Sequence, residues 1–225
     1  PRTQTKRIEL TIRTAMILIL VLWIASLAAG GLVYNRLPER VASHWNERGE
    51  VDGYSTRFVG SLFLPLLSGV MAFFLLFIPA IDPLKKNFDR FRSSYNLFVV
   101  FFVVFLLYLY ALTLLINFGH KFNLVVALIP AYAALTYVVG ELTSKAQPNW
   151  FIGIRTPWTL SSEIVWQETH RRSSRLFKLA AGVTLLGFVV PAYAFVFLIL
   201  PLLTIAIYSI VYSYLAYHRH TRIDL

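Results

Sequence analysis

The chain is 225 residues long, of which 57% are hydrophobic and 14% are charged. Soluble domains are roughly 45–50% apolar, so these proportions leave too little charge to cover a water-soluble surface and exclude an ordinary soluble fold. The absence of cysteine excludes a disulfide framework, a thiol nucleophile and a cysteine-based metal site. The formal net charge of +10 would suit nucleic acid, but in a membrane protein the distribution of charge decides its meaning, and no nucleic-acid partner is predicted.

Six apolar segments predict a bundle of six transmembrane helices, which makes the fold class an all-α integral membrane protein. Four of them cover about 14–34, 58–80, 95–116 and 123–140. The remaining apolar stretch, 176–217, is long enough for two crossings joined by a tight turn near 191–194. We expect the first segment to stay in the mature protein, because it is too long for a signal peptide and lacks a small-residue cleavage site.

The lysine and arginine residues indicate which loops face the cytoplasm. Four lie in the N-terminal segment, four in the 81–94 loop, six in the 141–178 segment and two in the tail, whereas five lie in the opposite loops. Cytoplasmic loops carry an excess of these residues. The distribution therefore predicts that both termini and the folded 141–175 loop are cytoplasmic, and that the folded 35–57 loop is extracytoplasmic.

The extracytoplasmic loop 35–57 has the composition of a compact folded segment. Turn dipeptides at 48–49 and 52–53 interrupt it, and its four arginines balance four acidic residues. We interpret His44, Trp45 and Asn46 as part of a recognition site, and the alternative, that Trp45 and Tyr54 are interfacial anchors, has equal weight. The candidate ligand-binding residues of this loop are His44, Trp45, Asn46, Gly49, Asp52, Gly53 and Tyr54.

A metal site could also be assembled in this loop from His44, Glu47, Glu50 and Asp52. The loop lacks the paired histidines of a zinc protease helix, and zinc sites usually recruit more histidine or cysteine. Its carboxylates can equally pair with the neighbouring arginines. We therefore predict no metal and no other cofactor.

The 149–170 stretch lies in the longest polar interruption of the chain and holds three of the five tryptophans. Gly153 permits a backbone conformation that other residues avoid. Thr156-Pro157 suits an N-cap followed by proline at the first helical position, and Ser161-Ser162 offers a second helix start. The stretch is therefore expected to be folded and not a flexible linker.

A helical pattern continues from Ser162 and places Glu163, Trp166 and His170 on one face. The three tryptophans could form an aromatic belt, but around a Gly-Ile-Arg-Thr-Pro turn they exceed what anchoring requires, so we favour a functional site. Arg155 could bind an anionic group or a helix C-terminus, and the basic residues of 171–178 are expected to contact lipid headgroups. The candidate residues of this motif are Asn149, Gly153, Arg155, Thr156, Pro157, Trp158, Ser161, Ser162, Trp166 and His170.

Residues with the chemistry of transport or catalysis are scarce. No Asp, Glu, Lys or Arg lies at the expected midplane of a span, which argues against ion-coupled transport but not against a passive channel. The chain has no His-Glu-x-x-His, Gly-x-Ser-x-Gly or cysteine nucleophile arrangement. We therefore predict no catalytic residues and expect a protein that is not an enzyme.

The two loops carry a resemblance to a known family. The outer loop, with Leu37-Pro38, His44-Trp45-Asn46 and Asp52-Gly53-Tyr54, looks like a small membrane domain of unknown function that often begins SdpI-family proteins. The inner stretch from Asn149 to His170 is similar to the C-terminal motif of that family. The chain thus resembles the SdpI family of bacterial membrane immunity proteins, as a two-span unit of residues 1–92 followed by an SdpI-like four-span unit of residues 93–225.

The family is named for a member that protects its producer against a secreted, membrane-active toxin peptide, and it also has a signalling role in which a cytoplasmic repressor is captured. The resemblance implies a multipass cell-membrane protein for toxin resistance and signal transduction. Its implied partners are the lipid bilayer, a toxin peptide outside and a regulator protein inside. The alternatives are a small-solute transporter or channel and, third, a membrane-embedded enzyme.

Overall fold

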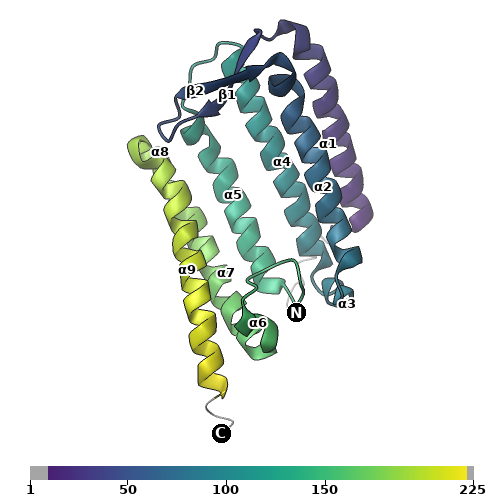
Figure 1. The fold of residues 1–225 in the computed structure, drawn as a ribbon, viewed down its shortest axis with the longest axis vertical. Helices are drawn as coiled ribbons and strands as arrows, with labels where there is room; N and C mark the ends of the chain where they lie inside the picture. The colour runs from purple at the N-terminus through teal and green to yellow at the C-terminus, as the bar shows by residue number, and fades with distance from the viewer. Residues whose placement is uncertain (1–9, 222–225) are drawn as a thin grey trace, which may run out of the picture.

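A computed structural model describes residues 10–221 of the chain as a bundle of long helices with a small hairpin at one end (Figure 1). The helices are α1 (Ile12–Val33), α2 (Leu64–Ile81), α3 (Lys85–Phe88), α4 (Arg92–Asn117), α5 (Leu124–Lys145), α6 (Pro157–Ser161), α7 (Glu163–Thr184), α8 (Leu186–Val189) and α9 (Ala194–Thr221). A π-helical turn, Val59–Phe63, leads into α2. Four residues of the charge count, Arg2, Lys6, Arg7 and Arg222, lie outside the described residues.

Within residues 10–221, five helical segments are long and apolar enough to cross a membrane. They are Ile12–Arg36, Val59–Ile81, Arg92–Asn117, Leu124–Lys145 and Pro191–Thr221. The chain turns at Pro191–Tyr193, where the apolar stretch 176–217 was expected to reverse. The sixth predicted crossing corresponds to α7 and α8, and the first half of α7 is polar, so the count of six stays a prediction.

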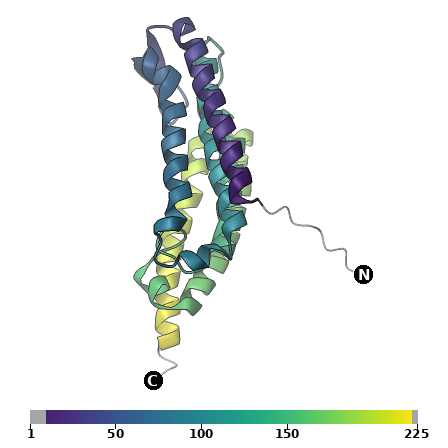
Figure 2. The ribbon, with the colours of Figure 1, turned by 90° about the vertical axis from the view of Figure 1, so that its right-hand side faces the viewer.

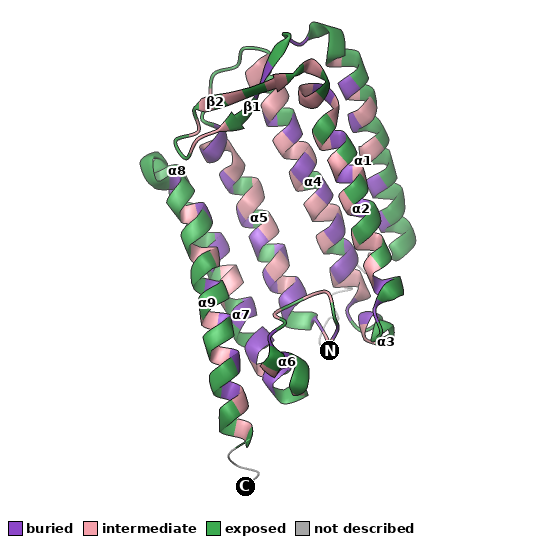
Figure 3. Cartoon of the chain, viewed as in Figure 1, coloured by how far each residue is buried: buried purple, intermediate pink, exposed green. Residues whose placement is uncertain are grey.

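The helices lie side by side along most of their length (Figures 1 and 2). α7 packs against both α5 and α9, while α4 contacts α1, α2 and α5. The hairpin covers one end of the bundle, and α6 and the beginning of α1 lie towards the other end (Figure 1). Buried residues face the neighbouring helices, and the outward faces of α1 and α9 are largely exposed apolar surface suited to lipid (Figure 3).

An aromatic core joins the N-terminal helices to the rest of the bundle. The Phe88 and Tyr95 rings meet edge to face with centroids 5.4 Å apart, and Ile19 of α1 packs into the same cluster. The Tyr95 hydroxyl donates to the Leu75 carbonyl at 2.5 Å, and the Tyr110 hydroxyl donates to the Ser61 carbonyl at 2.7 Å. These bonds supply partners inside the protein for polar groups that lipid could not satisfy.

The fold is mostly helical but not all-α, because the outer loop contains two strands. β1 (Arg40–Trp45) and β2 (Val51–Thr56) pair antiparallel, with register shifts on either side of His44. β-branched residues such as Val41, Val51 and Thr56 favour this extended conformation. The sequence analysis predicted a compact folded loop without strands in an all-α fold, and the structure corrects this by showing a two-stranded hairpin.

Candidate functional site

The hairpin turn is shaped by the Asn46 side chain. Its Oδ1 accepts from the backbone N–H groups of Arg48 and Glu50, both at 3.0 Å, and its Nδ2 donates to the Glu50 carboxylate at 2.9 Å. Gly49 adopts a φ of 76°, which favours glycine. The sequence selected Asn46 and Gly49 as binding residues, and the structure gives both a role in forming the turn.

His44 and Asp52 face each other across the two strands. His44 Nδ1 lies 2.5 Å from Asp52 Oδ1, with 74% and 43% of the two side chains exposed. Gly53 lies opposite His44, and a Cβ at that position would come within 2.8 Å of the His44 Cβ. Glycine therefore permits the close approach of the strands at this irregularity.

The four residues of the alternative metal site do not gather. Glu47 pairs with Arg48, and Glu50 accepts from Asn46, while His44 pairs only with Asp52 among them. No group of three or more histidine or acidic residues within 10–221 is placed to hold a metal ion.

A mainly apolar pocket of about 400 Å³ lies beneath the hairpin. The hairpin forms its roof, while the π-helical turn, the start of α2, α4 and α5 form its walls, and Phe195 of α9 contributes from the side. The lining residues are Ala42, Ser43, His44, Trp45, Asn46, Ser55, Val59, Gly60, Phe63, Leu64, Leu109, Thr113, Leu124, Val125, Leu128 and Phe195. Predicted residues His44, Trp45 and Asn46 thus line one cavity, whereas Gly49, Asp52, Gly53 and Tyr54 do not.

Trp45, one of the residues that line the pocket, carries a buried polar atom without a partner among residues 10–221. Its Nε1 is buried and has no hydrogen-bond partner in the described part of the chain. A buried donor without a partner costs free energy, typically about 1–3 kcal/mol. Tyr54, in contrast, is 57% exposed, with the Arg40 guanidinium 5.4 Å from its ring centroid.

Two asparagines outside the hairpin hold it over the pocket. At the end of α4, Asn117 Oδ1 accepts from the Ala42 N–H at 2.7 Å, and its Nδ2 donates to the Ala42 carbonyl at 3.1 Å. Asn123 Nδ2 donates to the Arg48 carbonyl at 2.6 Å. The roof is therefore fixed to the α4–α5 connection, a partnership that no local sequence pattern indicated.

The inner loop is organised around Asn149, which is fully buried. Its Oδ1 accepts from the N–H groups of Phe151 and Ile152 at 2.9 and 2.6 Å, and its Nδ2 donates to the carbonyls of Gln147 and Ile152 at 2.8 and 2.9 Å. One side chain thus satisfies four backbone groups of a loop that lacks its own regular structure. Asn149 is a structural residue of this loop.

Gly153 brings the loop against α7. It has a φ of 109°, and a Cβ there would overlap with Nε2 of His170. His170 Nε2 accepts from the Ile154 N–H at 3.0 Å, and its Nδ1–H donates to the Trp166 carbonyl at 2.8 Å. The neutral imidazole satisfies both bonds, and burial lowers the pKa of His170, which lies outside the five apolar spans, to about 4. The prediction that Gly153 needs a special backbone conformation agrees with this geometry.

Trp166 and His170 form the buried face of α7, with ring centroids 4.0 Å apart and planes 17° from parallel. Trp166 Nε1 donates to the Ala146 carbonyl at 2.9 Å. Glu163, which was expected on the same face, is exposed and receives a hydrogen bond from Gln167. The three residues share one side of α7 as expected, but burial begins at Val165, so Glu163 at the first position of the helix remains at the surface.

The rest of the motif forms helix starts. The side chain of Thr156 caps α6 by accepting from the Thr159 N–H at 3.2 Å, Pro157 opens the helix, and Ser162 caps α7. Thr156 also donates to the Ser213 hydroxyl of α9 at 3.0 Å. The Ser161 hydroxyl donates to the Pro157 carbonyl at 2.6 Å. These contacts fix the loop beneath α7 and α9.

Arg155 and two tryptophans occupy the surface of this loop. Arg155 donates to the Trp150 carbonyl of its own loop at 2.6 Å, and its binding of an anionic group stays a prediction. Trp158 meets the Tyr214 ring edge to face at 5.2 Å, while Trp150 is 53% exposed. The three tryptophans therefore differ in environment, and only Trp166 is part of the Gly153 contact.

Two residues that the sequence did not select hold the inner loop from the N-terminal half. The buried Asp82 accepts from the Leu84 N–H at 2.6 Å and from the Trp150 N–H at 2.9 Å. Asn87 donates to the Pro148 carbonyl at 2.7 Å. A lone acidic residue ending an apolar segment just before proline was the available signal for Asp82. Its partner Trp150 lies 68 residues away in the chain, so no sequence signal indicated the pairing itself.

Comparison with known proteins agrees with these two loops. Residues 145–213 match the SdpI/YfhL protein family, and residues 21–69 match a domain of unknown function, DUF1648. The immunity protein SdpI of Bacillus subtilis (strain 168) is 25% identical over 200 residues, which cover 86% of this chain and 89% of that protein. No solved structure matches the chain.

These matches and the five apolar helices define a multipass protein of the cell membrane. The resemblance to the SdpI family is confirmed: its signature region lies at residues 145–213, behind a DUF1648 region. The chain is thus similar to an immunity protein along most of its length, which favours a function other than catalysis.

The Gly153 contact predicts a local effect of adding one methyl group. Gly153→Ala should undock the loop from His170 and destabilise it by on the order of 1–3 kcal/mol, the usual cost of a strained backbone. Faster hydrogen exchange of the peptide containing Ile154 would report this. Gly119→Ala is the matched control, because Gly119 has a φ of 93° but a Cβ added there would meet no atom within 4 Å. Equal protection of Ile154 in both variants would contradict the contact.

The His170 hydrogen bonds predict that the inner loop opens in acid. The pKa of about 4 in the docked loop lies below the ordinary value of 6.5, so the undocked form binds more protons between these values. Docking should therefore be strongest above pH 6.5 and weaken as the pH falls towards 4. Hydrogen exchange of residues 149–158, corrected for intrinsic rates, measures this. His170→Gln should remove the pH dependence and His218→Gln, at an exposed position, should retain it; the reverse result would contradict the assignment.

Proposed function

We propose that this protein confers immunity by binding an apolar, membrane-active peptide in the pocket beneath the β1–β2 hairpin. The observation that carries the proposal is the mainly apolar cavity of about 400 Å³ beneath the hairpin, which Trp45 lines and whose wall holds the buried, unpartnered Nε1–H of that residue. The similarity to an immunity protein supports the biological role. The protein acts in this proposal by capture and not by catalysis.

The chemistry of the pocket suits such a peptide. Its deep part is lined by side chains such as Phe63, Leu109 and Leu128, which would cover apolar side chains. Its rim carries the Ser43 hydroxyl and the His44 imidazole, and polar groups at this level can bind the peptide backbone. The Trp45 N–H supplies a donor for one peptide carbonyl. Binding would therefore remove the apolar side chains of the peptide from the bilayer.

The proposed topology places this pocket outside the cell. It has six crossings with both termini and the inner loop in the cytoplasm, as the charge distribution favours. α7 and α8 together cover 163–189, which at 1.5 Å per residue spans about 40 Å, and they end at the turn beside α9. The length of the whole pair supports a sixth crossing, of which the apolar part, 176–189, covers about 20 Å, and the polar first half of α7 packs against α5 and α9.

The structure also offers a path for the proposed relay to a cytoplasmic regulator. β2 leads through the π-helical turn directly into α2, and Asp82 caps the far end of α2. The Asp82 carboxylate accepts from the Trp150 N–H of the inner loop. A peptide that displaces the hairpin would thus act through one helix on the loop that faces the regulator.

Survival of a sensitive bacterial host exposed to membrane-permeabilising peptides tests the pocket. Leu128→Trp should fill the cavity and abolish protection, while Leu115→Trp, on an exposed face of α4 outside the lining, should protect fully. Trp45→Phe keeps the ring and removes the N–H, so it should weaken protection by roughly tenfold in peptide dose, as expected for one lost hydrogen bond. Equal protection by the two leucine variants, at equal abundance in the membrane, would rule out the pocket.

Single cysteines test the topology, since the chain has none of its own. Arg48→Cys and Val189→Cys should react with a membrane-impermeant maleimide in intact cells, whereas Ser161→Cys should react only after permeabilisation. All three positions are exposed. Labelling of residues 161 and 189 from the same side would show that α7 and α8 do not cross.

A further inference from the structure

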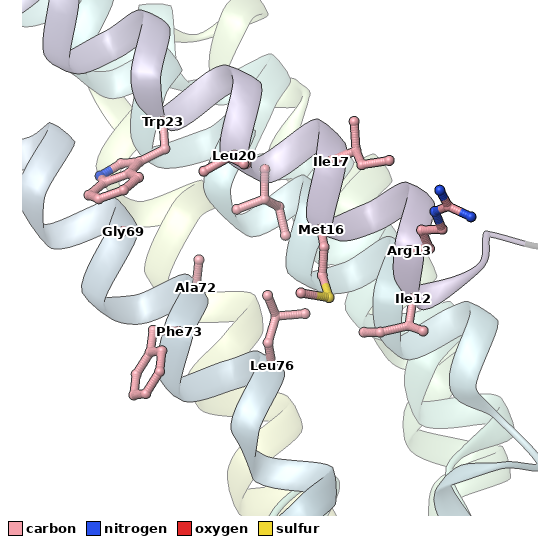
Figure 4. A pocket seen from close by; sticks show the side chains of 11 residues that line it. Ile12, Arg13, Met16, Ile17, Leu20, Trp23, Gly69, Ala72, Phe73 and Leu76 are labelled. Atoms are coloured by element: carbon pink, nitrogen blue, oxygen red, sulfur yellow. The ribbon is translucent and has the colours of Figure 1, made fainter.

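A second apolar cavity lies between α1 and α2, and it shares no lining residue with the hairpin pocket. This fissure has a volume of about 660 Å³. Met16 and Leu20 of α1 line one side of it, and Ala72 and Leu76 of α2 line the other (Figure 4). Apart from Arg13 at the start of α1, every side chain that lines it is apolar or the indole of Trp23.

Trp23 closes the fissure at the end farther from the start of α1. Its Nε1 donates to the Pro65 carbonyl at 3.0 Å, and its ring lies so close to Gly69 that a Cβ there would overlap with it (Figure 4). The indole is therefore held flat across α2. The fissure is a built feature with a fixed end, because both the donor bond and the glycine are needed to seat the ring.

The length of the fissure matches the thickness of the hydrocarbon layer of one bilayer leaflet. From Ile12 to Trp23, α1 rises 11 residues, or about 16 Å at 1.5 Å per residue. The hydrocarbon core of a bilayer is about 30 Å thick, so one leaflet contributes about 15 Å. The fissure thus runs from the start of α1 to the middle of the membrane, which is the depth that one acyl chain occupies.

Charge at the mouth of the fissure favours an anionic headgroup. Arg13 is exposed and points away from α2 in Figure 4, and within residues 10–221 no carboxylate forms an ion pair with it. A guanidinium binds phosphate oxygens in a bidentate manner. The start of α1 adds partial positive charge from its helix dipole.

From these observations we infer that the α1–α2 fissure is a binding site for one anionic phospholipid of the leaflet that faces the start of α1. The acyl chain fills the space between Met16, Leu20 and Leu76 as far as Trp23, and the phosphate lies beside Arg13. Lipid is the occupant because α1 and α2 are both candidate spans and the fissure opens between them onto the surrounding medium. This site is independent of peptide capture.

Native mass spectrometry of the detergent-purified protein tests the inference with phosphatidylglycerol as the probe. The wild-type protein should retain one lipid molecule. Leu20→Trp places an indole in the fissure and should lower the retained fraction at least about tenfold, since each methylene that loses its burial weakens binding about fourfold. Leu18→Trp is the matched control, because Leu18 is an exposed residue of the same helix outside the lining and should retain the lipid.

Arg13→Gln tests the headgroup. The wild-type protein should prefer phosphatidylglycerol over phosphatidylcholine with the same acyl chains, and the variant should bind the two equally. Met16→Trp replaces Leu20→Trp if the latter does not accumulate. Equal lipid retention by the position 18 and 20 variants would overturn the inference, as would an unchanged headgroup preference in Arg13→Gln. A disulfide-linked dimer of Leu20→Cys in native membranes would also overturn it, by showing that a second copy fills the fissure.

Discussion

Backbone N–H and C=O groups that lie near a bilayer but outside regular helices need hydrogen-bond partners within the protein, because hydrocarbon supplies none. In this structure the side chains of asparagine and aspartate meet that need. Asn149 satisfies four backbone groups of the inner loop, and Asn46 organises the hairpin turn through two N–H groups. The irregular segments can therefore hold one conformation next to the membrane, and both candidate sites depend on it.

The same side-chain chemistry joins the two halves of the chain. At one end of the bundle, Asn117 and Asn123 bind the backbone of the hairpin, and at the other end, Asp82 and Asn87 bind the backbone of the inner loop. These contacts cross the expected boundary near residue 92 in both directions. The two units predicted from the sequence are thus not independent bodies, and each supplies hydrogen-bond partners for the other's loop.

The apolar segments were predictable because length and hydrophobicity are local properties. The helices α1, α4 and α5, and α2 together with its π-helical turn, contain the expected spans to within a few residues, and the chain reverses at Pro191–Tyr193, where the turn was expected. The hairpin was missed because its strands have only six residues each, and the irregular register at His44 breaks the alternation that marks a strand. Within residues 10–221, α7 is not among the helices apolar enough to cross a membrane, because its first half is polar, so the sixth crossing stays a prediction.

Side-chain environments were less predictable than the loops that contain them. His44, Trp45 and Gly153 were selected from residue type and position, but Phe195 enters the outer pocket from a helix that starts about 150 residues later in the chain than Trp45. Only the packing of α9 beside α5 brings it there.

Asn149 and His170 were selected as functional residues because a sequence does not distinguish a polar side chain that is buried for structural reasons from one that binds a ligand. The structure distinguishes them by their hydrogen bonds. Asn149 and His170 have partners within the protein, whereas the buried Trp45 N–H has none in the described part of the chain. The hairpin pocket combines this unpartnered donor in its wall with an apolar cavity, so binding is better supported there than in the inner loop.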